Sequence, residues 1–277
     1  MTKQELTEQI LRKQSYLCIG LDTDLNKIPS HLRHEKYPLV AFNKQIIDAT
    51  AEYTIAYKLN TAFYEAQGAK GWESMQRTLE LIPKNILTIA DAKRGDIGNT
   101  CDMYAQAFFE ALTFDAITLS PYMGKDSLEP FLKYENKWLI LLVLTSNESS
   151  IDFQFLPLQN GNLLYEQVLT QAQKWANFER LMFVVGATQS ESIAKVRKLA
   201  PLNFLLIPGI GTQGGDLEAV SKHGFNADIG ILVNVSRAVI YASKDKTFAQ
   251  TAKKEAQNLQ ALMQNYLEKY YFTHYSV

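Results

Sequence analysis

Eight short apolar runs alternate with longer segments of helical spacing along the 277-residue chain, and this alternation constrains the fold more than any other feature. Each run has the length of a buried strand, and the segments between them place apolar residues three or four positions apart, as an amphipathic helix does. Alternating strands and helices form parallel sheets. Eight such units predict an α/β protein with a single (β/α)8 TIM barrel over residues 1–277. The alternative is a doubly wound open sheet.

The expected strands are residues 17–21, 55–59, 86–90, 116–119, 139–144, 181–185, 204–207 and 229–233. The clearest helical segments between them are residues 39–53, 75–81, 103–112, 163–175 and 193–199. Two further helices, near residues 4–13 and at residues 248–266, are expected to flank the barrel at its two chain ends. A polar segment at residues 146–162 reads as an insertion after the fifth strand.

Composition and charge exclude several classes of function. The net charge of −1 creates no long-range field that would attract nucleic acid or an anionic membrane, so we expect neither partner. The polar amino terminus lacks the apolar core of a signal peptide, and no apolar stretch approaches the about 18 residues of a membrane span. The two cysteines and four histidines fall in no metal-ligand spacing. We therefore expect a cytoplasmic protein without a metal or an organic cofactor.

The segment that follows the third expected strand carries the strongest chemical signal. Asp91 and Lys93 come directly after an apolar run and are two positions apart, so their side chains share one face of the strand. Gly95 then permits a turn, and Asp96 adds a second carboxylate. A surface salt bridge is the alternative, because exposed pairs of this kind are common and weak. Paired acids and a lysine at the end of a buried strand favour a catalytic strand end.

Polar residues also occur where most of the other expected strands end, which is where barrel enzymes place their active sites. Residues 208–216, after the seventh strand, contain four glycines whose backbone amides can approach a ligand closely. Arg237 follows the eighth strand and can offer a charged fork to phosphate oxygens. A glycine-rich loop alone is often only a turn. With Arg237 beside it, the loop predicts a phosphate site.

The string Asp-Ala-Lys-Arg-Gly-Asp-Ile-Gly-Asn-Thr at residues 91–100 resembles the signature of the orotidine 5′-phosphate decarboxylase family, in the form of its longer bacterial subgroup, type 2. The resemblance implies a catalytic array of alternating charges: Lys58, Asp91, Lys93 and Asp96. It implies that Asp22 and Lys58 contact the ribose and that Ser146 reads the pyrimidine. The implied phosphate residues are Pro208, Gly209, Gly211, Gln213 and Arg237. One departure is Ser236, where many phosphate barrels have glycine.

The family's activity is the decarboxylation of orotidine 5′-phosphate to UMP in pyrimidine biosynthesis. The resemblance implies that Lys93 protonates C6 of the pyrimidine, that Asp91 crowds the leaving carboxylate, and that fixed charges replace a cofactor. It also implies a homodimer in which Asp96, Ile97 and Thr100 reach the neighbouring site.

Two alternatives remain at this stage. The first is a sugar-phosphate enzyme that shares the barrel motif and needs Mg²⁺, either 3-keto-gulonate 6-phosphate decarboxylase or hexulose-phosphate synthase. The second is a phosphate-binding barrel without catalysis. The full 92–100 string and the Thr145-Ser146-Asn147 turn favour the nucleotide substrate over the sugar phosphates, and a scaffold would not need the alternating charges.

Overall fold

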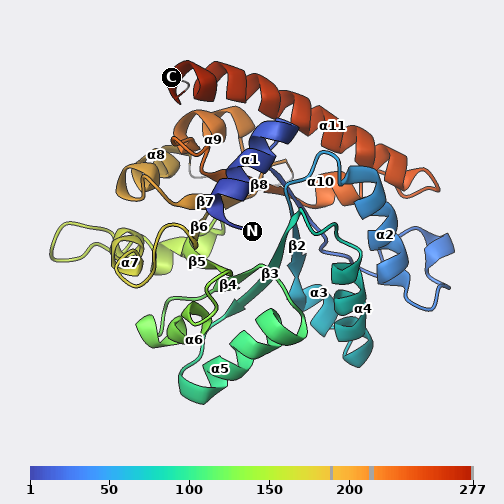
Figure 1. Cartoon of the computed structure of the whole chain (residues 1–277), viewed down its shortest axis with the longest axis horizontal. Helices are drawn as coiled ribbons and strands as arrows, with labels where there is room; N and C mark the ends of the chain where they lie inside the picture. The colour runs from blue at the N-terminus through green and yellow to red at the C-terminus, as the bar shows by residue number, and fades with distance from the viewer. Residues whose placement is uncertain (188–189, 212–214, 276–277) are drawn as a thin grey trace.

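The computed structural model contains a closed parallel barrel of eight strands in sequence order, which confirms the predicted (β/α)8 fold (Figure 1). The structure describes residues 1–187, 190–211 and 215–275. The strands are nearly continuous apolar runs, as expected where both faces of a parallel sheet are buried. Their bounds are β1 Leu17–Gly20, β2 Ala56–Asn60, β3 Leu87–Arg94, β4 Ala116–Leu119, β5 Trp138–Leu144, β6 Leu181–Val185, β7 Phe204–Pro208 and β8 Ile231–Val235.

Helices surround the barrel, and the long α11 lies along the outside of α2, α9 and α10 (Figure 1). The longer helices are α1 Lys3–Lys13, α2 Pro38–Thr50, α4 Ala69–Glu80, α5 Gly98–Gln106, α7 Leu164–Ala172, α8 Ser190–Leu199, α9 Leu217–Gly224 and α11 Phe248–Tyr266. Shorter pieces are η1 Ser30–Leu32, α3 Thr61–Glu65, the π-helix η2 Ala107–Ala111, η3 Lys125–Ser127, α6 Glu129–Leu132, η4 Glu148–Asp152, α10 Arg237–Ile240, the π-helix η5 Leu267–Phe272 and α12 Thr273–Tyr275.

Two strands differ in their bounds from the sequence-based expectation by more than one residue. β3 continues four residues past Ala90 to Arg94, so the acid and lysine of the motif are part of the strand. β8 begins at Ile231, two residues later than expected, because Ile229 and Gly230 have φ angles of 66° and 67° and form a turn. Apolar character alone does not separate such a turn from the strand that follows it.

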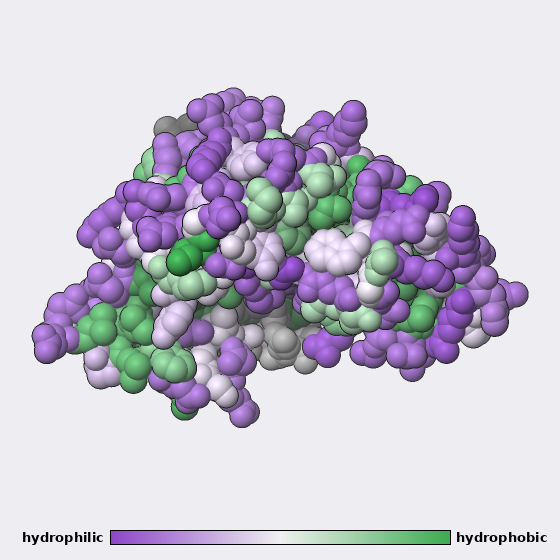
Figure 2. Space-filling view, turned by 90° about the horizontal axis from the view of Figure 1, so that it is seen from below, coloured by the Kyte–Doolittle hydropathy of each residue, from purple (hydrophilic) through white to green (hydrophobic). Residues whose placement is uncertain are grey.

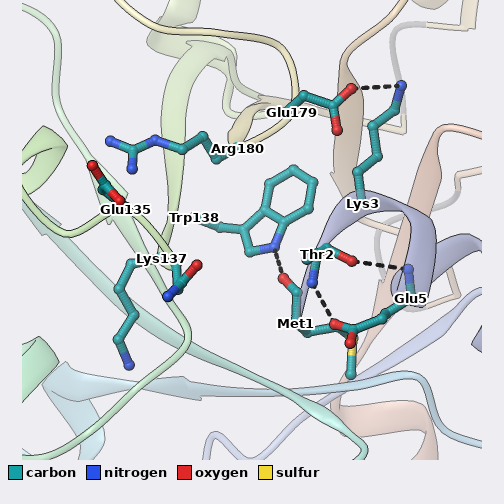
Figure 3. A pocket seen from close by; sticks show the side chains of 10 residues that line it. Met1, Thr2, Lys3, Glu5, Glu135, Lys137, Trp138, Glu179 and Arg180 are labelled. Atoms are coloured by element: carbon teal, nitrogen blue, oxygen red, sulfur yellow. Dashed lines mark hydrogen bonds and ion pairs between the residues drawn. The ribbon is translucent and has the colours of Figure 1, made fainter.

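Helix α1 covers the amino-terminal end of the barrel (Figure 1). Its first turn is fixed by a capping box, in which Thr2 and Glu5 each accept a hydrogen bond from the other's backbone amide. The indole of Trp138, at the start of β5, donates to the Met1 carbonyl at 2.8 Å (Figure 3). The buried Lys3 pairs with Asp228 at 2.6 Å. These contacts leave the opposite, carboxyl-terminal end of the barrel as the place for a site.

Candidate active site

Two adjoining cavities lie at the carboxyl ends of the strands. One, of about 260 Å³, is lined by polar groups from β2 to β5 and by apolar side chains such as Leu142 and Val184. The other, of about 160 Å³, is mostly polar and extends toward the ends of β1, β7 and β8. Lys58, Asp91 and Pro208 line both cavities and so mark the boundary between them. The cleft therefore has an apolar half and a polar half with ionisable groups between them.

Asp91 lies at the centre of this boundary and is bonded by two lysines. Its Oδ2 accepts a hydrogen bond from Lys58 Nζ at 2.7 Å, and its Oδ1 accepts one from Lys93 Nζ at 2.5 Å. Asp22 Oδ1 lies 3.6 Å from Lys58 Nζ on the other side. The structure thus brings together Lys58, Asp91 and Lys93, as predicted, with Asp22 next to them. The shared face of Asp91 and Lys93 is confirmed.

Burial and pairing hold these groups in their charged forms. Burial alone would lower the pKa of Lys58, but Asp22 and Asp91 outweigh it and raise that pKa above its ordinary value. Burial alone would raise the pKa of Asp91, but Lys58 and Lys93 outweigh it and hold that pKa well below its ordinary range. Lys58 and Asp91 are 5% and 9% exposed, so solvent screens their attraction little. The cleft therefore presents fixed opposite charges at neutral pH.

Asp22 leaves one acceptor unused. Its Oδ1 is buried and has no hydrogen-bond partner among the described residues, because Lys58 at 3.6 Å is too far for a hydrogen bond. The loop that carries Asp22 is held by Tyr241, whose hydroxyl donates to the Asp22 carbonyl at 3.1 Å and accepts from the Asp24 amide at 2.7 Å. A rigid, unsatisfied carboxylate oxygen at a cavity wall suits a hydroxyl donor on a ligand.

The polar half of the cleft has the backbone geometry of an anion site. Gly209 and Gly211 have φ angles of 106° and 82°, in the left-handed region that favours glycine. The Gly215 amide donates to the Gly209 carbonyl at 3.1 Å, so the two ends of this loop are joined. Arg237 begins α10 and lines the same cavity. Gln213, the other predicted phosphate residue, lies outside the described residues.

Comparison with known proteins assigns the chain. The model of the orotidine 5′-phosphate decarboxylase / HUMPS family matches residues 15–252. The chain belongs to this family. A protein of Flavobacterium johnsoniae named orotidine 5′-phosphate decarboxylase is 58% identical over 266 residues, which cover 95% of this chain and 97% of the relative. A protein of the same name from Phocaeicola vulgatus is 56% identical over 267 residues, covering 95% and 98%.

A solved decarboxylase has the same fold. The structure of Leishmania donovani OMP decarboxylase superposes with a TM-score of 0.79 at 36% sequence identity, and the match covers 94% of this chain and 99% of that one. The resemblance that the motif at residues 91–100 suggested is therefore confirmed over nearly the whole chain, as is the barrel.

Three residues of the decarboxylase motif, Asp96, Ile97 and Thr100, do not join the charged cluster of their own chain. Asp96 accepts a hydrogen bond from the Ile97 amide at 2.8 Å, and none of the ion pairs found among the described residues joins it to Lys58 or Lys93. Ile97 is 55% exposed, and Thr100 is exposed as well. Ile97 and Thr100 therefore lie at the surface of the chain and Asp96 is half-buried, and the predicted role of all three at a neighbouring site stays a prediction.

Sequence reasoning missed one polar residue of the decarboxylase cleft. Thr118, inside β4, is 1% exposed and lines the apolar cavity, where its hydroxyl donates to Asp91 Oδ1 at 3.1 Å. A single hydroxyl in the run Ala116–Leu119 was the available signal. Threonine is common in strands for reasons of shape alone, so this signal does not stand out.

Larger cavities elsewhere do not share this chemistry. One of about 470 Å³ lies at the amino-terminal end of the barrel, lined by Met1, Trp138, Arg180 and residues near them (Figure 3). Two of its charged groups, the buried Lys3 and the exposed Glu179, lie 3.9 Å apart. Within residues 1–187, 190–211 and 215–275, no group of three or more His, Cys, Asp or Glu side chains could hold a metal ion. In the same ranges, no helix has the length and apolar character needed to cross a membrane.

Proposed function

We propose that this chain converts orotidine 5′-phosphate to UMP and CO2 in pyrimidine biosynthesis, with Lys93 as the proton donor. The observation that carries the proposal is the pairing at the end of β3, where one buried carboxylate holds a lysine on each of its oxygens beside an apolar cavity. The two relatives at 56% and 58% identity, both named orotidine 5′-phosphate decarboxylase, support the substrate.

The two halves of the cleft suit the two ends of the substrate. The apolar cavity, which Ser146 and Leu142 line, would hold the pyrimidine. Asp22, through its unsatisfied Oδ1, and Lys58 would bind the ribose hydroxyls between the cavities. The glycine loop from Pro208, with Gln213 and Arg237, would bind the phosphate. In this pose the bond to be broken lies near Asp91 and Lys93.

The chemistry follows from the fixed charges. The bond from C6 to the carboxylate breaks, CO2 leaves, and the electron pair stays on C6. The Lys93 ammonium stabilises this carbanion and then gives it a proton, which completes UMP. Asp91 faces the substrate carboxylate before the bond breaks and holds Lys93 in place by the 2.5 Å hydrogen bond. Lys58 balances the charge of Asp91, and contacts to the distant phosphate supply binding energy.

The proposal includes a homodimer with shared sites. Ile97, Met103 and Tyr122 are 55%, 59% and 87% exposed and follow β3 and β4 at the end of the barrel that carries the cleft. Figure 2 shows apolar, green residues gathered at the lower left of the molecule, where hydrophilic surface surrounds them. Exposed apolar groups near a site support an interface there. A second copy would bring Asp96, Ile97 and Thr100 to the neighbouring cleft.

We place the enzyme in the cytoplasm and expect neither nucleic acid nor a membrane as a partner. The net charge of −1 supports the first absence. Nucleotides carry charged phosphates that do not cross a bilayer unaided, so a step in their synthesis belongs where they are used.

A substrate assay in the presence of EDTA tests the proposed function. The purified protein should consume orotidine 5′-phosphate, followed by its absorbance, and form UMP in equal amount without added metal. Parallel reactions contain 3-keto-gulonate 6-phosphate, or the substrates of hexulose-phosphate synthase, with Mg²⁺. Turnover of a sugar phosphate in place of the nucleotide would assign the chain to the other branch of the family. Binding of the nucleotide without turnover would make the barrel a phosphate-binding protein.

A further inference from the structure

The end of β3 departs from regular parallel pairing at the residues that carry the charges. Ala90 pairs with Ile117 of β4, but the next pair is Arg94 with Leu119. Three residues of β3 therefore lie opposite the single residue Thr118. Lys93 takes up this excess with a φ of 48°, in the left-handed region that is unfavourable for a residue with a side chain. Such a conformation persists only where surrounding contacts hold it.

The hydroxyl of Thr118 fills the gap that the bulge opens in the ladder. The backbone amide of Lys93 donates to Thr118 Oγ1 at 2.9 Å, and Oγ1 donates to Asp91 Oδ1 at 3.1 Å. A hydroxyl has one proton, so the direction of both bonds is fixed by the amide on one side and the carboxylate on the other. Thr118 itself pairs regularly with Ile140 of β5, so its position does not depend on the bulge.

These bonds connect the backbone of Lys93 to its own side chain. Asp91 Oδ1 accepts both the Thr118 hydroxyl and the Lys93 ammonium. The bulge therefore sets where the ammonium lies, and the hydroxyl holds the bulge. Arg94 secures the other flank: its guanidinium donates to the Ala92 carbonyl at 2.8 Å and pairs with Glu65. It cannot replace the hydroxyl, because it contacts neither the Lys93 amide nor Asp91 in the described chain.

We propose that Thr118 is a positioning residue of the decarboxylation, whose hydroxyl holds the Lys93 backbone and the Asp91 carboxylate in the geometry that proton transfer needs. This inference rests on the proposed function for its kinetic consequence but not for its structural one. If Thr118 only filled space in the strand, a side chain of the same shape could replace it without a loss of kcat.

Substitution of Thr118 by valine or by serine separates the effect of side-chain shape from the effect of the hydroxyl. Thr118→Val keeps the shape and removes the hydroxyl, and Thr118→Ser keeps the hydroxyl. We expect the valine variant to lose about ten- to a hundredfold in kcat, because a charged acceptor and a buried amide each lose a partner. KM should stay within about threefold, since the phosphate and ribose contacts are unchanged. The serine variant should recover kcat to within about threefold of the parent.

Thr88→Val is the matched control. Thr88 is also a buried strand threonine, and its hydroxyl donates to Asp115 Oδ2 at 2.8 Å and accepts from the Asp115 amide at 2.9 Å. It lies at the opposite end of β3 from the cleft. Thr88→Val should shift the unfolding midpoint as much as Thr118→Val does but leave kcat unchanged. If both variants lower kcat in proportion to their loss of stability, Thr118 has only a structural role.

A measurement without turnover keeps the inference separate from the proposed function. Hydrogen exchange at the Lys93 amide, observed by NMR on protein labelled with ¹⁵N-lysine, should be at least about tenfold faster in Thr118→Val than in the parent and in Thr118→Ser. An inactive parent protein would overturn the proposed function, and the exchange rates would still decide the role of Thr118. Unchanged exchange, or a valine variant with kcat within threefold of the parent, would overturn the inference.

Discussion

Asp91 lies between the two lysines of the cleft and accepts a hydrogen bond from each. It accepts hydrogen bonds from Lys58, Lys93 and the Thr118 hydroxyl, and all of these lie within 3.1 Å. Its pKa and that of Lys58 move in opposite directions, so both groups stay charged at neutral pH. Both lysines line the apolar cavity, but the Lys93 side chain is 49% exposed and that of Lys58 is 6% exposed. That difference supports the proposal that Lys93, rather than Lys58, reaches a substrate carbon.

Replacement of Lys93 by alanine should abolish turnover and leave UMP binding largely intact. In the proposed mechanism the ammonium is the proton donor, while the proposed ribose and phosphate contacts come from other strands. Turnover and UMP affinity are measured on the same preparation. Lys44→Ala, which removes an exposed lysine paired with Asp48 on α2, serves as the control and should be fully active. Near-normal kcat in Lys93→Ala would end its assignment as proton donor.

Replacement of Arg237 by alanine should lower kcat/KM by about ten- to a hundredfold, because a charge-assisted hydrogen bond is worth about 1.5–3 kcal/mol. The defect should largely disappear for a substrate fragment without phosphate. Arg77→Ala, at an exposed arginine on α4 that pairs with Glu73, is the matched control. A defect of equal size on the phosphate-free fragment would show that Arg237 does not bind the phosphate.

At the scale of elements, apolar periodicity located the strands well and their ends less well. Seven of the eight strands begin within one residue of the expectation, since buried parallel strands are unbroken apolar runs. Helix α4 begins at Ala69, six residues before the expected segment, because its first turns carry little apolar signal. Gly71 lies there because an added Cβ would stand 1.7 Å from the Tyr64 carbonyl oxygen. A close approach of this kind is a tertiary constraint that spacing does not reveal.

The candidate site also contains some features that the sequence predicts and others that it does not. Asp91 and Lys93 are neighbours in sequence, so their contact could be predicted from strand geometry. Asp22 and Arg237 are more than 200 residues apart; the end of the eighth strand placed Arg237 in the cleft, and the family resemblance gave Asp22 its role there. The bulge at Lys93 and the role of Thr118 could not be predicted, because the register between β3 and β4 depends on how both strands pack into the closed barrel.

The hydrogen bonds that join α8 to neighbouring segments give a prediction at the scale of elements. The Arg197 guanidinium is buried and donates to four carbonyls, of Ala200, Asn203, Gly224 and Gly230, at 2.7–2.8 Å. Arg197→Met removes this donor from all four carbonyls, of which that of Gly230 keeps a hydrogen bond from the Leu205 amide, and each buried unsatisfied group costs about 1–3 kcal/mol. We expect a loss of at least about 3 kcal/mol in the free energy of unfolding, measured in denaturant.

The control for this variant is Lys198→Met, which changes the exposed next residue of α8 and should be neutral. Equal stability of the two variants would mean that the four carbonyls find other partners.

At the scale of the whole molecule, the proposed dimer allows a complementation test. Asp96→Ala and Lys93→Ala are each expected to be inactive. In a heterodimer of the two, one site collects both defects and the other collects neither. Random exchange of subunits makes half of the dimers mixed, with half of their sites intact, so about a quarter of the parent activity should return. Subunit exchange is verified by mass spectrometry of differently tagged chains. Exchange without recovered activity would mean that Asp96 acts within its own chain.

The helix that covers the amino-terminal end of the barrel has a kinetic consequence. Among the described residues, core side chains fill the barrel interior and α1 crosses its base, so we expect substrate and nucleotide product to use the same opening, at the carboxyl ends of the strands. Departure of UMP must precede entry of the next substrate molecule, and the two can never occupy one cleft together. UMP should therefore raise the apparent KM and leave the maximal rate unchanged in steady-state inhibition experiments. A drop in maximal rate would point to a second place for UMP on the protein.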